Sequence, residues 1–308
     1  MNQQLLNTIK GLTEKGNRDN ISRTKAYEHF FSKHPEIRWS LLAGVVSRNA
    51  GWNMCDLAGN WLPHILTERY RRQLFLTYEE ANWRIFQDAY PQLLLYHYSK
   101  KYNRPLFHLG KHFFMTTFME KEWQRFWQLR DEKRLVYALI INEQHVIERP
   151  VIRKRSFVFH SVLFLLQDWL HYSTVLFPTC FGQLYGFSVA NFCDVDARIH
   201  LGKKLYELLF TPDLFPFFYQ FVLTTEPTGA RYDYEQYGNH SPTAMTPTLR
   251  KTYPIIYHSI DGTDQWDVRN RIKSKWFRAP KRMKNVCLTD WYYKKQQHIE
   301  TIVNIMSK

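Results

Sequence analysis

The stretch SFVFHSVLFLLQDWLHYSTVLF, from Ser156 to Phe177, decides the fold that the sequence predicts. It is long enough for about six helical turns and is apolar around most of its circumference, which is typical of a helix surrounded by other helices. At 100° per residue, His160, Gln167 and His171 fall within about 40° of one another. Asp168 lies about 60° further round. Such a polar stripe indicates either a narrow solvent window or the wall of a buried site.

The segments on either side of this stretch are mainly helical in pattern. Apolar residues recur at helical spacing in most of the first 225 residues, while residues 177–192 look like an irregular connection. We find no internal repeat and no alternating pattern strong enough to build a sheet. The sequence therefore predicts an all-α protein, a multi-helix orthogonal bundle around a buried central helix at about 156–177.

A change in composition marks the C-terminal part of the chain. From Glu226 the sequence becomes rich in Gly, Pro, Thr and Tyr, and it then turns strongly basic. We expect a helical domain over residues 1–225 and a loop-rich basic C-terminal extension over 226–308, packed on that domain or flanking it.

Composition places the chain among soluble globular proteins. Hydrophobic residues make up 44% and aromatic residues 17%, which supplies a sizeable core and excludes global disorder. The N-terminus has no uninterrupted apolar segment, and the His, Gln and Asp side chains in 156–177 argue against a membrane span. The four cysteines lack CxxC or metal-ligand spacing, so we expect reduced thiols. We expect a cytoplasmic protein without integral membrane association.

Positive charge is concentrated near the C-terminus. The formal net charge of the chain is +14, and residues 268–295 hold ten basic residues against the single acid Asp290. Segregated charge of this kind favours a polyanionic partner, DNA or RNA before an anionic membrane. Aromatic residues interleaved with it, from Trp276 to Tyr292, suit stacking on bases. The alternative is a basic surface that serves solubility. The candidate nucleic-acid-binding residues are Arg269, Arg271, Lys273, Lys275, Arg278, Lys281, Arg282 and Lys284.

A second group of candidates interrupts the apolar face of a helix predicted within residues 36–57. Asn49 lies in the middle of that face, Asn53 inside its edge and Arg48 beside it. The opposite side carries small residues, such as Gly44, that allow a neighbouring helix to approach closely. An asparagine on an apolar face needs partners, so it either makes a structural hydrogen bond or borders a site.

A third group lies in the next long helical segment. Thr77 with Glu80 forms a capping box, so we expect a helix to begin there. Pro91 cannot donate to the carbonyl of Gln87, which predicts a kink and a free acceptor beside Asp88. Gln87 and Asp88 are therefore candidate ligand-binding residues.

Glu143 is the most unusual charge in the helical part. In residues 134–149 it points about 180° away from Arg134, into an apolar arc, so it must be paired or have a raised pKa. The face that we expect to be solvated carries Arg134, Asn142, His145, Glu148 and Arg149.

These residues allow three hypotheses: a nucleic-acid-associated protein, an enzyme or small-ligand-binding protein, and a scaffold whose buried polar groups fix helix register. For an enzyme, Glu143 and Asp168 would be the acid and base, with His171 as proton carrier. Arg48 would hold an anion, and Asn49, Asn53, Gln87 and Asp88 would contact the ligand. We expect a common interior region for the side chains of Arg48, Asn49, Asp88, Glu143 and Asp168.

We expect neither a metal nor a cofactor. His160 and His171 lie roughly 16 Å apart along a helix, too far to share one ion. Asp168 and His171 could share a divalent ion with Glu143, but Asp168 could equally orient His171 or pair with Arg48 without a metal.

Several long and unusual motifs carry a resemblance to a known family. They are ISRTKAYEHFFSKHPEIRW, SRNAGWNMCDL, FQDAYPQLLLY, LIINEQ and GKKLYELLF. Together they resemble the bacterial domain-of-unknown-function family 2515, typical of Bacillus and its relatives, over about residues 20–235. The resemblance implies no activity, and the basic C-terminal end lies outside it.

Overall fold

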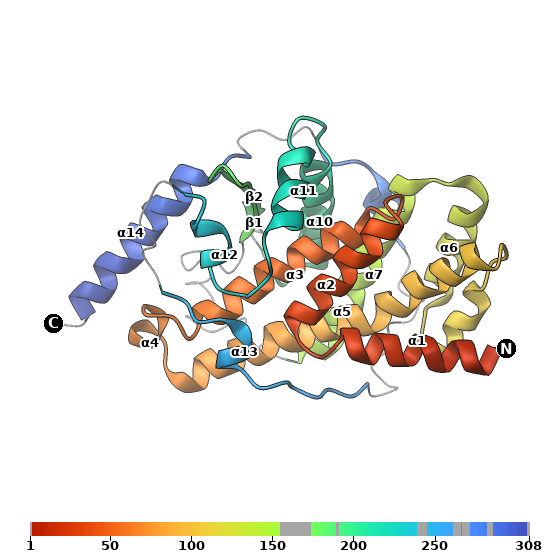
Figure 1. The fold of residues 1–308 in the computed structure, drawn as a ribbon, viewed down its shortest axis with the longest axis horizontal. Helices are drawn as coiled ribbons and strands as arrows, with labels where there is room; N and C mark the ends of the chain where they lie inside the picture. Colours follow the sequence, from red (N-terminus) through yellow and green to blue (C-terminus); the bar gives the residue numbers. More distant parts are fainter. Residues whose placement is uncertain are drawn as a thin grey trace.

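The computed structural model describes residues 2–154, 174–188, 191–238, 245–260, 266, 272–281 and 286–306. In these ranges the chain is predominantly helical, which confirms the predicted all-α class (Figure 1). The elements are α1 (Asn2–Gly16), α2 (Asn20–Lys33), α3 (Trp39–Asp56), α4 (Leu62–Ile65), α5 (Glu68–Lys101), η1 (Phe107–Phe113), α6 (Thr117–Leu129), α7 (Glu132–Ile147), η2 (Glu148–Arg153), β1 (Thr174–Pro178), β2 (Leu184–Ser188), α10 (Val195–Leu209), α11 (Phe215–Thr224), α12 (Tyr232–Glu235), α13 (Leu249–Thr252), η4 (Ser274–Phe277) and α14 (Thr289–Met306).

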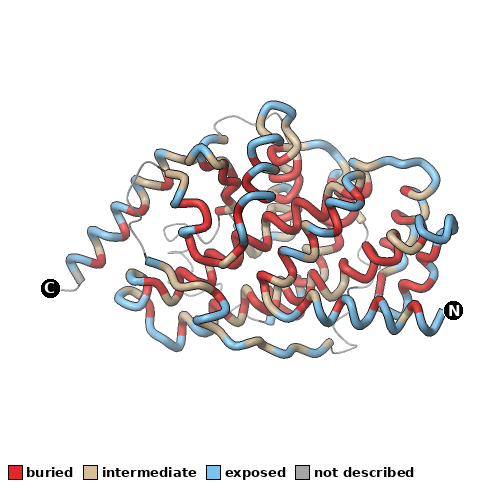
Figure 2. Tube along the Cα trace, in the orientation of Figure 1, coloured by how far each residue is buried: buried red, intermediate tan, exposed pale blue. Residues whose placement is uncertain are grey.

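Helix α3 lies among α2, α5, α7 and α10, and its small residues allow close packing. A Cβ on Gly44 would lie 3.3 Å from Cγ of Glu28 in α2, so α2 approaches as the sequence predicts. All residues of α3 except Val46 and Asn53 are buried. Figure 2 shows the buried positions where the helices meet and the exposed positions on their outer sides.

Helix α5 begins ten residues, nearly three turns, earlier than predicted. Thr67 caps it by accepting a hydrogen bond from the backbone N–H of Tyr70, and Glu68 is its first residue. Thr77 lies inside the helix, where its hydroxyl donates to the carbonyl of Gln73. The predicted start at Thr77 is therefore wrong, because Thr67 is the residue that caps the helix. The helix continues past Pro91 to Lys101.

The sequence missed the small sheet. Strands β1 and β2 pair antiparallel, with Leu176 opposite Gly186. A Cβ on Gly186 would lie 2.0 Å from the Val175 carbonyl oxygen, so glycine is required there. The predicted central helix is wrong at its C-terminal end, because Thr174–Phe177 belong to β1. Residues 156–173 of that prediction lie outside the described residues.

The described residues of the C-terminal extension pack on the helical part. The Gly186 N–H donates to the Val286 carbonyl, and the Leu288 N–H donates to the Leu184 carbonyl, so residues 286–288 extend the edge of β2. Trp266 and Trp276 join the main hydrophobic core. A division at residue 226 into a domain and an extension stays a prediction. Among the described helices, none combines the length and apolar character that crossing a membrane requires.

We predict that Asn49→Ala lowers the free energy of unfolding by about 3 kcal/mol, measured by urea denaturation. The Asn49 side chain joins α3 to β1: its Oδ1 accepts from the Leu176 N–H at 2.7 Å and its Nδ2 donates to the Leu176 carbonyl at 2.7 Å. Alanine leaves both buried backbone groups without a partner. Asn82→Ala is the matched control, because the Asn82 amide donates within its own helix to the Tyr78 carbonyl. Equal losses in the two variants would contradict the structural role of Asn49.

Candidate functional site

A cavity of about 180 Å³ lies between α2, α3, α5, α7, α10 and β1. Val46 and Asn53, the two residues of α3 that are not buried, both border it, since seven residues bring them to the same face of the helix. Most of the wall is apolar. The polar and charged side chains along the wall include Arg23, Tyr27, Asn49, Asn53, Tyr78, Asn82, Glu143, Gln144 and Arg198.

Glu143 brings a carboxylate from α7 to this cavity. Its Oε2 accepts from the indole Nε1 of Trp39 at 3.0 Å, and its Oε1 accepts from Nε2 of Gln144 at 3.0 Å. Burial raises the pKa of Glu143 to about 7, and these two hydrogen bonds offset only part of that effect. Within the described part of the chain, no Lys, Arg or His lies within ion-pair distance of it. The side chain stays partly accessible because it borders the cavity.

Tyr27 brings a hydroxyl from α2 to the same cavity. The residue is 3% exposed, and within the described residues its hydroxyl has no hydrogen-bond partner. Its ring packs against Trp39 and Phe86, with centroids 5.6 and 5.0 Å away. Burial, and then the nearby charge of Glu143, raise the pKa of Tyr27 well above its ordinary value. Sequence reasoning missed Tyr27, because an aromatic residue on an apolar helix face is indistinguishable from core.

The two arginines at the cavity are already paired. Arg23 forms a two-pronged ion pair with Glu79, with Nη1 and Oε2 2.9 Å apart. Arg198 pairs with Glu148 and donates from Nε to Oε1 of Gln144 at 2.9 Å. Their positive charges are therefore compensated, whereas the charge of Glu143 is not.

The structure brings together three of the predicted site residues. Asn49, Asn53 and Glu143 border the one cavity. The Asn49 amide is fully engaged with β1, so of the three it has the clearest structural role. Asp168 and His171 lie outside the described residues.

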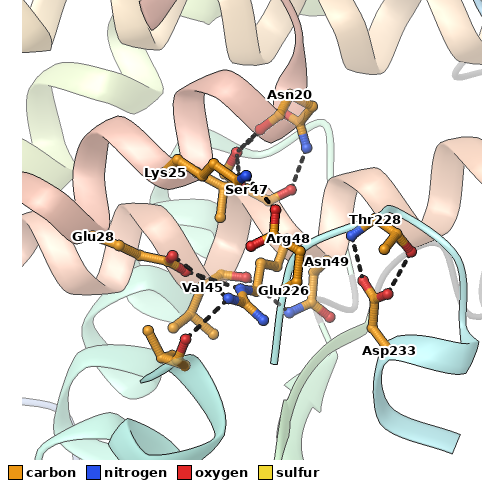
Figure 3. Close-up of polar contacts among 12 residues, drawn as sticks. Asn20, Lys25, Glu28, Val45, Ser47, Arg48, Asn49, Glu226, Thr228 and Asp233 are labelled. Atoms are coloured by element: carbon orange, nitrogen blue, oxygen red, sulfur yellow. Dashed lines mark hydrogen bonds and ion pairs between the residues drawn. The ribbon is translucent and has the colours of Figure 1, made fainter. Parts of the chain in front are cut away.

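Arg48 does not join them, so the expected convergence is wrong for this residue. Its Nε donates to Glu28 at 2.9 Å, and its Nη2 donates to the Val222 carbonyl at 3.2 Å. Figure 3 shows the Arg48 side chain reaching Glu28, near the ion pair of Lys25 and Glu226. These groups border a separate hollow of about 440 Å³. Adjacent residues of a helix point about 100° apart, so Arg48 and Asn49 face different neighbours.

Asp88 also lies elsewhere, beside a cavity of about 50 Å³ that Trp266 helps to line. Its Oδ2 accepts from Nε2 of Gln92 at 2.9 Å and from the Asn142 amide. Burial raises the pKa of Asp88 to about 7. Asp88 therefore does not border the cavity of Glu143, although its charge, like that of Glu143, acts on the Tyr27 hydroxyl. Its neighbour Gln87 accepts from the Asn17 amide at 3.1 Å.

The α7 face that the sequence predicts to be solvated is partly covered. Asn142 is 1% exposed and accepts from the indole of Trp266 at 3.0 Å. His145 is buried and lies between the rings of Trp266 and Trp276. The prediction failed because both covering tryptophans come from the C-terminal extension, more than 100 residues further along the chain.

The basic segment is partly occupied by contacts within the chain. Lys273, Lys275 and the Trp276 indole all contact the carboxylate of Asp196 at the start of α10. Trp276 and Tyr292 are buried, so their expected role as exposed stacking platforms is wrong. Of the other candidates, Arg278 and Lys281 are described, while Arg269, Arg271, Arg282 and Lys284 lie outside the described residues.

No group of three or more His, Cys, Asp or Glu side chains within the described ranges is arranged to hold a metal ion.

Comparison with known proteins places the chain among relatives without a described activity. It matches the family described as "Protein of unknown function (DUF2515)" over residues 15–292. It is 48% identical over 303 residues to the Bacillus subtilis (strain 168) protein named "Uncharacterized protein YppC", which covers 97% of this chain and 94% of the relative. No solved structure matches the chain. The match confirms the resemblance in the sequence and extends it beyond residues 20–235.

We predict that Glu143→Gln stabilises the protein at pH 8 by up to about 3 kcal/mol and has little effect near pH 5, measured by urea denaturation. Folding raises the pKa of Glu143 from its ordinary 4.5 to about 7, so the folded state disfavours the ionised form. The resulting loss of stability is absent below about pH 4.5 and grows until the pH passes about 7. Glutamine stays neutral at every pH and removes this loss. Glu300→Gln, on the exposed side of α14, is the control. An E143Q variant that is destabilised equally at pH 5 and pH 8 would contradict the assignment.

Proposed function

The chain belongs to the DUF2515 family of proteins of unknown function, and from that premise we propose that it binds a small, largely apolar molecule in the cavity bordered by Glu143. The observation that carries the proposal is the combination of apolar walls with two polar groups. Among the described residues, the Glu143 carboxylate has no cation beside it and the Tyr27 hydroxyl has no hydrogen-bond partner. Small-molecule sites commonly have this composition, a mostly hydrophobic wall with a few placed polar groups.

The volume limits the size of the ligand. Apolar cavities of about 150 Å³ accept benzene, so a cavity of about 180 Å³ suits a molecule of roughly eight non-hydrogen atoms. Leu42 and Val46 of α3, Ile85 of α5 and Leu205 of α10 supply apolar wall from three helices. Burying apolar surface against them contributes about 25 cal/mol per Å².

Acid–base chemistry at Glu143 is compatible with binding. A carboxyl group with a pKa near 7 can both take and give a proton at neutral pH. A reaction would need a second group, and the partners predicted from sequence, Asp168 and His171, lie outside the described residues. Binding is the function that the described groups support by themselves.

Nucleic-acid binding is the second candidate, favoured by the concentration of charge in residues 268–295. Intramolecular contacts of Lys273 and Lys275 with Asp196 weaken it. A truncation after residue 267 would not test it cleanly, because it would remove the buried Trp276 and Tyr292 from the core.

We predict that benzyl alcohol, a neutral probe of suitable size, raises the melting temperature of the protein, and that Val46→Phe abolishes the rise. The phenyl ring would occupy the cavity that Val46 borders. At a probe concentration ten times the dissociation constant, the stabilisation is about 1.4 kcal/mol. Leu223→Phe, which enlarges a side chain at the separate hollow near Arg48, is the matched control and should keep the full shift. Equal shifts in both variants would contradict binding in this cavity.

For the second candidate, we predict that replacing Lys281 and Lys284 with Ala weakens binding to a single-stranded oligonucleotide. The slope of the logarithm of the binding constant against the logarithm of the salt concentration should become shallower by about 1.4, at roughly 0.7 per phosphate contact. Fluorescence anisotropy over a salt series measures both quantities. Replacing the exposed Lys10 and Lys111 is the control for overall charge. No affinity of the unmodified protein at low salt would end the nucleic-acid hypothesis.

A further inference from the structure

We infer that the ligand of this cavity is a small amine, bound as its ammonium ion by the carboxylate of Glu143 and the hydroxyl of Tyr27. The inference rests on the proposed function and adds the chemical class of the ligand. It depends on two properties of the described wall, the balance of its charges and the hydrogen bonds that it leaves unmade.

The charges along the wall favour a cation. Glu79 compensates Arg23, and Glu148 compensates Arg198, so neither guanidinium needs an anion from a ligand. Glu143 has hydrogen bonds from two neutral groups and, among the described residues, no cation beside it. An ammonium group would supply the missing positive charge, whereas an anionic ligand would meet a like charge in a site with little water to screen it.

The hydrogen-bonding groups favour an ammonium that carries N–H bonds. The Tyr27 hydroxyl is buried and has no partner among the described residues, so its oxygen is free to accept a hydrogen bond. An ammonium has three donors and no acceptor, and can therefore serve the carboxylate and the hydroxyl together. A neutral alcohol has a single donor.

The phenols and guanidinium groups beside the cavity keep their charge states near neutral pH. Burial raises the pKa of Tyr27 and Tyr78 above the ordinary value of 10, so both phenols stay protonated. The guanidinium groups of Arg23 and Arg198 stay charged. Burial also raises the pKa of Glu79, which holds Arg23. Asp88, whose charge acts on Tyr27, also has a pKa raised to about 7 by burial. Since Glu79 and Asp88 can titrate in the same range as Glu143, the test needs a variant of Glu143 itself.

The experiment compares benzylamine, benzyl alcohol and benzoate, three probes that share one ring, by calorimetry at pH 8 and pH 5.5. At pH 8 we expect benzylamine to bind about tenfold more tightly than benzyl alcohol, since a buried charge pair adds roughly 1.4 kcal/mol, and benzoate to bind most weakly. With the Glu143 pKa at about 7, the affinity for benzylamine should fall about thirtyfold at pH 5.5, where the carboxyl group is mostly protonated. The affinity for benzyl alcohol should change little.

Two variants identify the groups responsible. Glu143→Gln should keep the affinity for benzyl alcohol and lose both the preference for the amine and its pH dependence. Tyr27→Phe should lower the affinity for benzylamine at least about tenfold through loss of one hydrogen bond to a charged group. It should unfold at the same or a higher urea concentration, because the hydroxyl that it lacks has no partner in the folded protein. That stability measurement separates a lost contact from a damaged fold.

The possible results distinguish this inference from the proposed function. Binding of benzyl alcohol with equal or weaker binding of benzylamine, or an amine preference that survives in E143Q, would overturn the amine assignment and leave the ligand-binding function standing. No binding of any of the three probes would overturn both.

Discussion

The burial of α3 is the constraint on which the rest of the structure depends. Nearly every residue of this helix is enclosed by neighbours, so each polar side chain along it must find its partner on a different element. Arg48 finds Glu28 on α2, Asn49 holds the edge of β1, and Asp56 forms a two-pronged ion pair with Arg231 just before α12. One helix thereby fixes the positions of segments that are up to 175 residues away in the chain.

The cavity follows from the same packing. Val46 and Asn53 are the two positions of α3 that are only half-buried, and helices α2, α5, α7 and α10 enclose the space beside them. Glu143 of α7 and Tyr27 of α2 both border this space, although they lie far apart in the sequence. Among the described residues the Tyr27 hydroxyl has no hydrogen-bond partner and the Glu143 carboxylate has no cation beside it. Both groups are costly to bury in that state, and the protein nevertheless buries them beside space that a ligand can fill. The proposed ligand would supply the charge and the donors that the wall lacks.

The sequence predicted features that depend on local periodicity and missed those that depend on distant partners. Helical spacing identified the all-α class, the small-residue face of α3 and the inward direction of Glu143. It could not show that Trp266 and Trp276 would cover α7, because no local pattern links segments so far apart. It also missed β1 and β2, since strands of five residues are too short for a clear alternation in the sequence. The expected convergence of Arg48 with Asn49 required two adjacent helical residues to face one site, which helix geometry opposes.

The central claim is that an ionised Glu143 carries the charge of the site. The most direct test of it is the release of protons when a ligand binds. Near pH 7 the carboxyl group is about half protonated before binding, and an ammonium ligand would require it to be ionised. Calorimetry of benzylamine binding in buffers with different ionisation enthalpies should therefore give about half a proton released per ligand at pH 7, and none for E143Q. A proton release near zero for the unmodified protein, with benzylamine bound, would contradict the account.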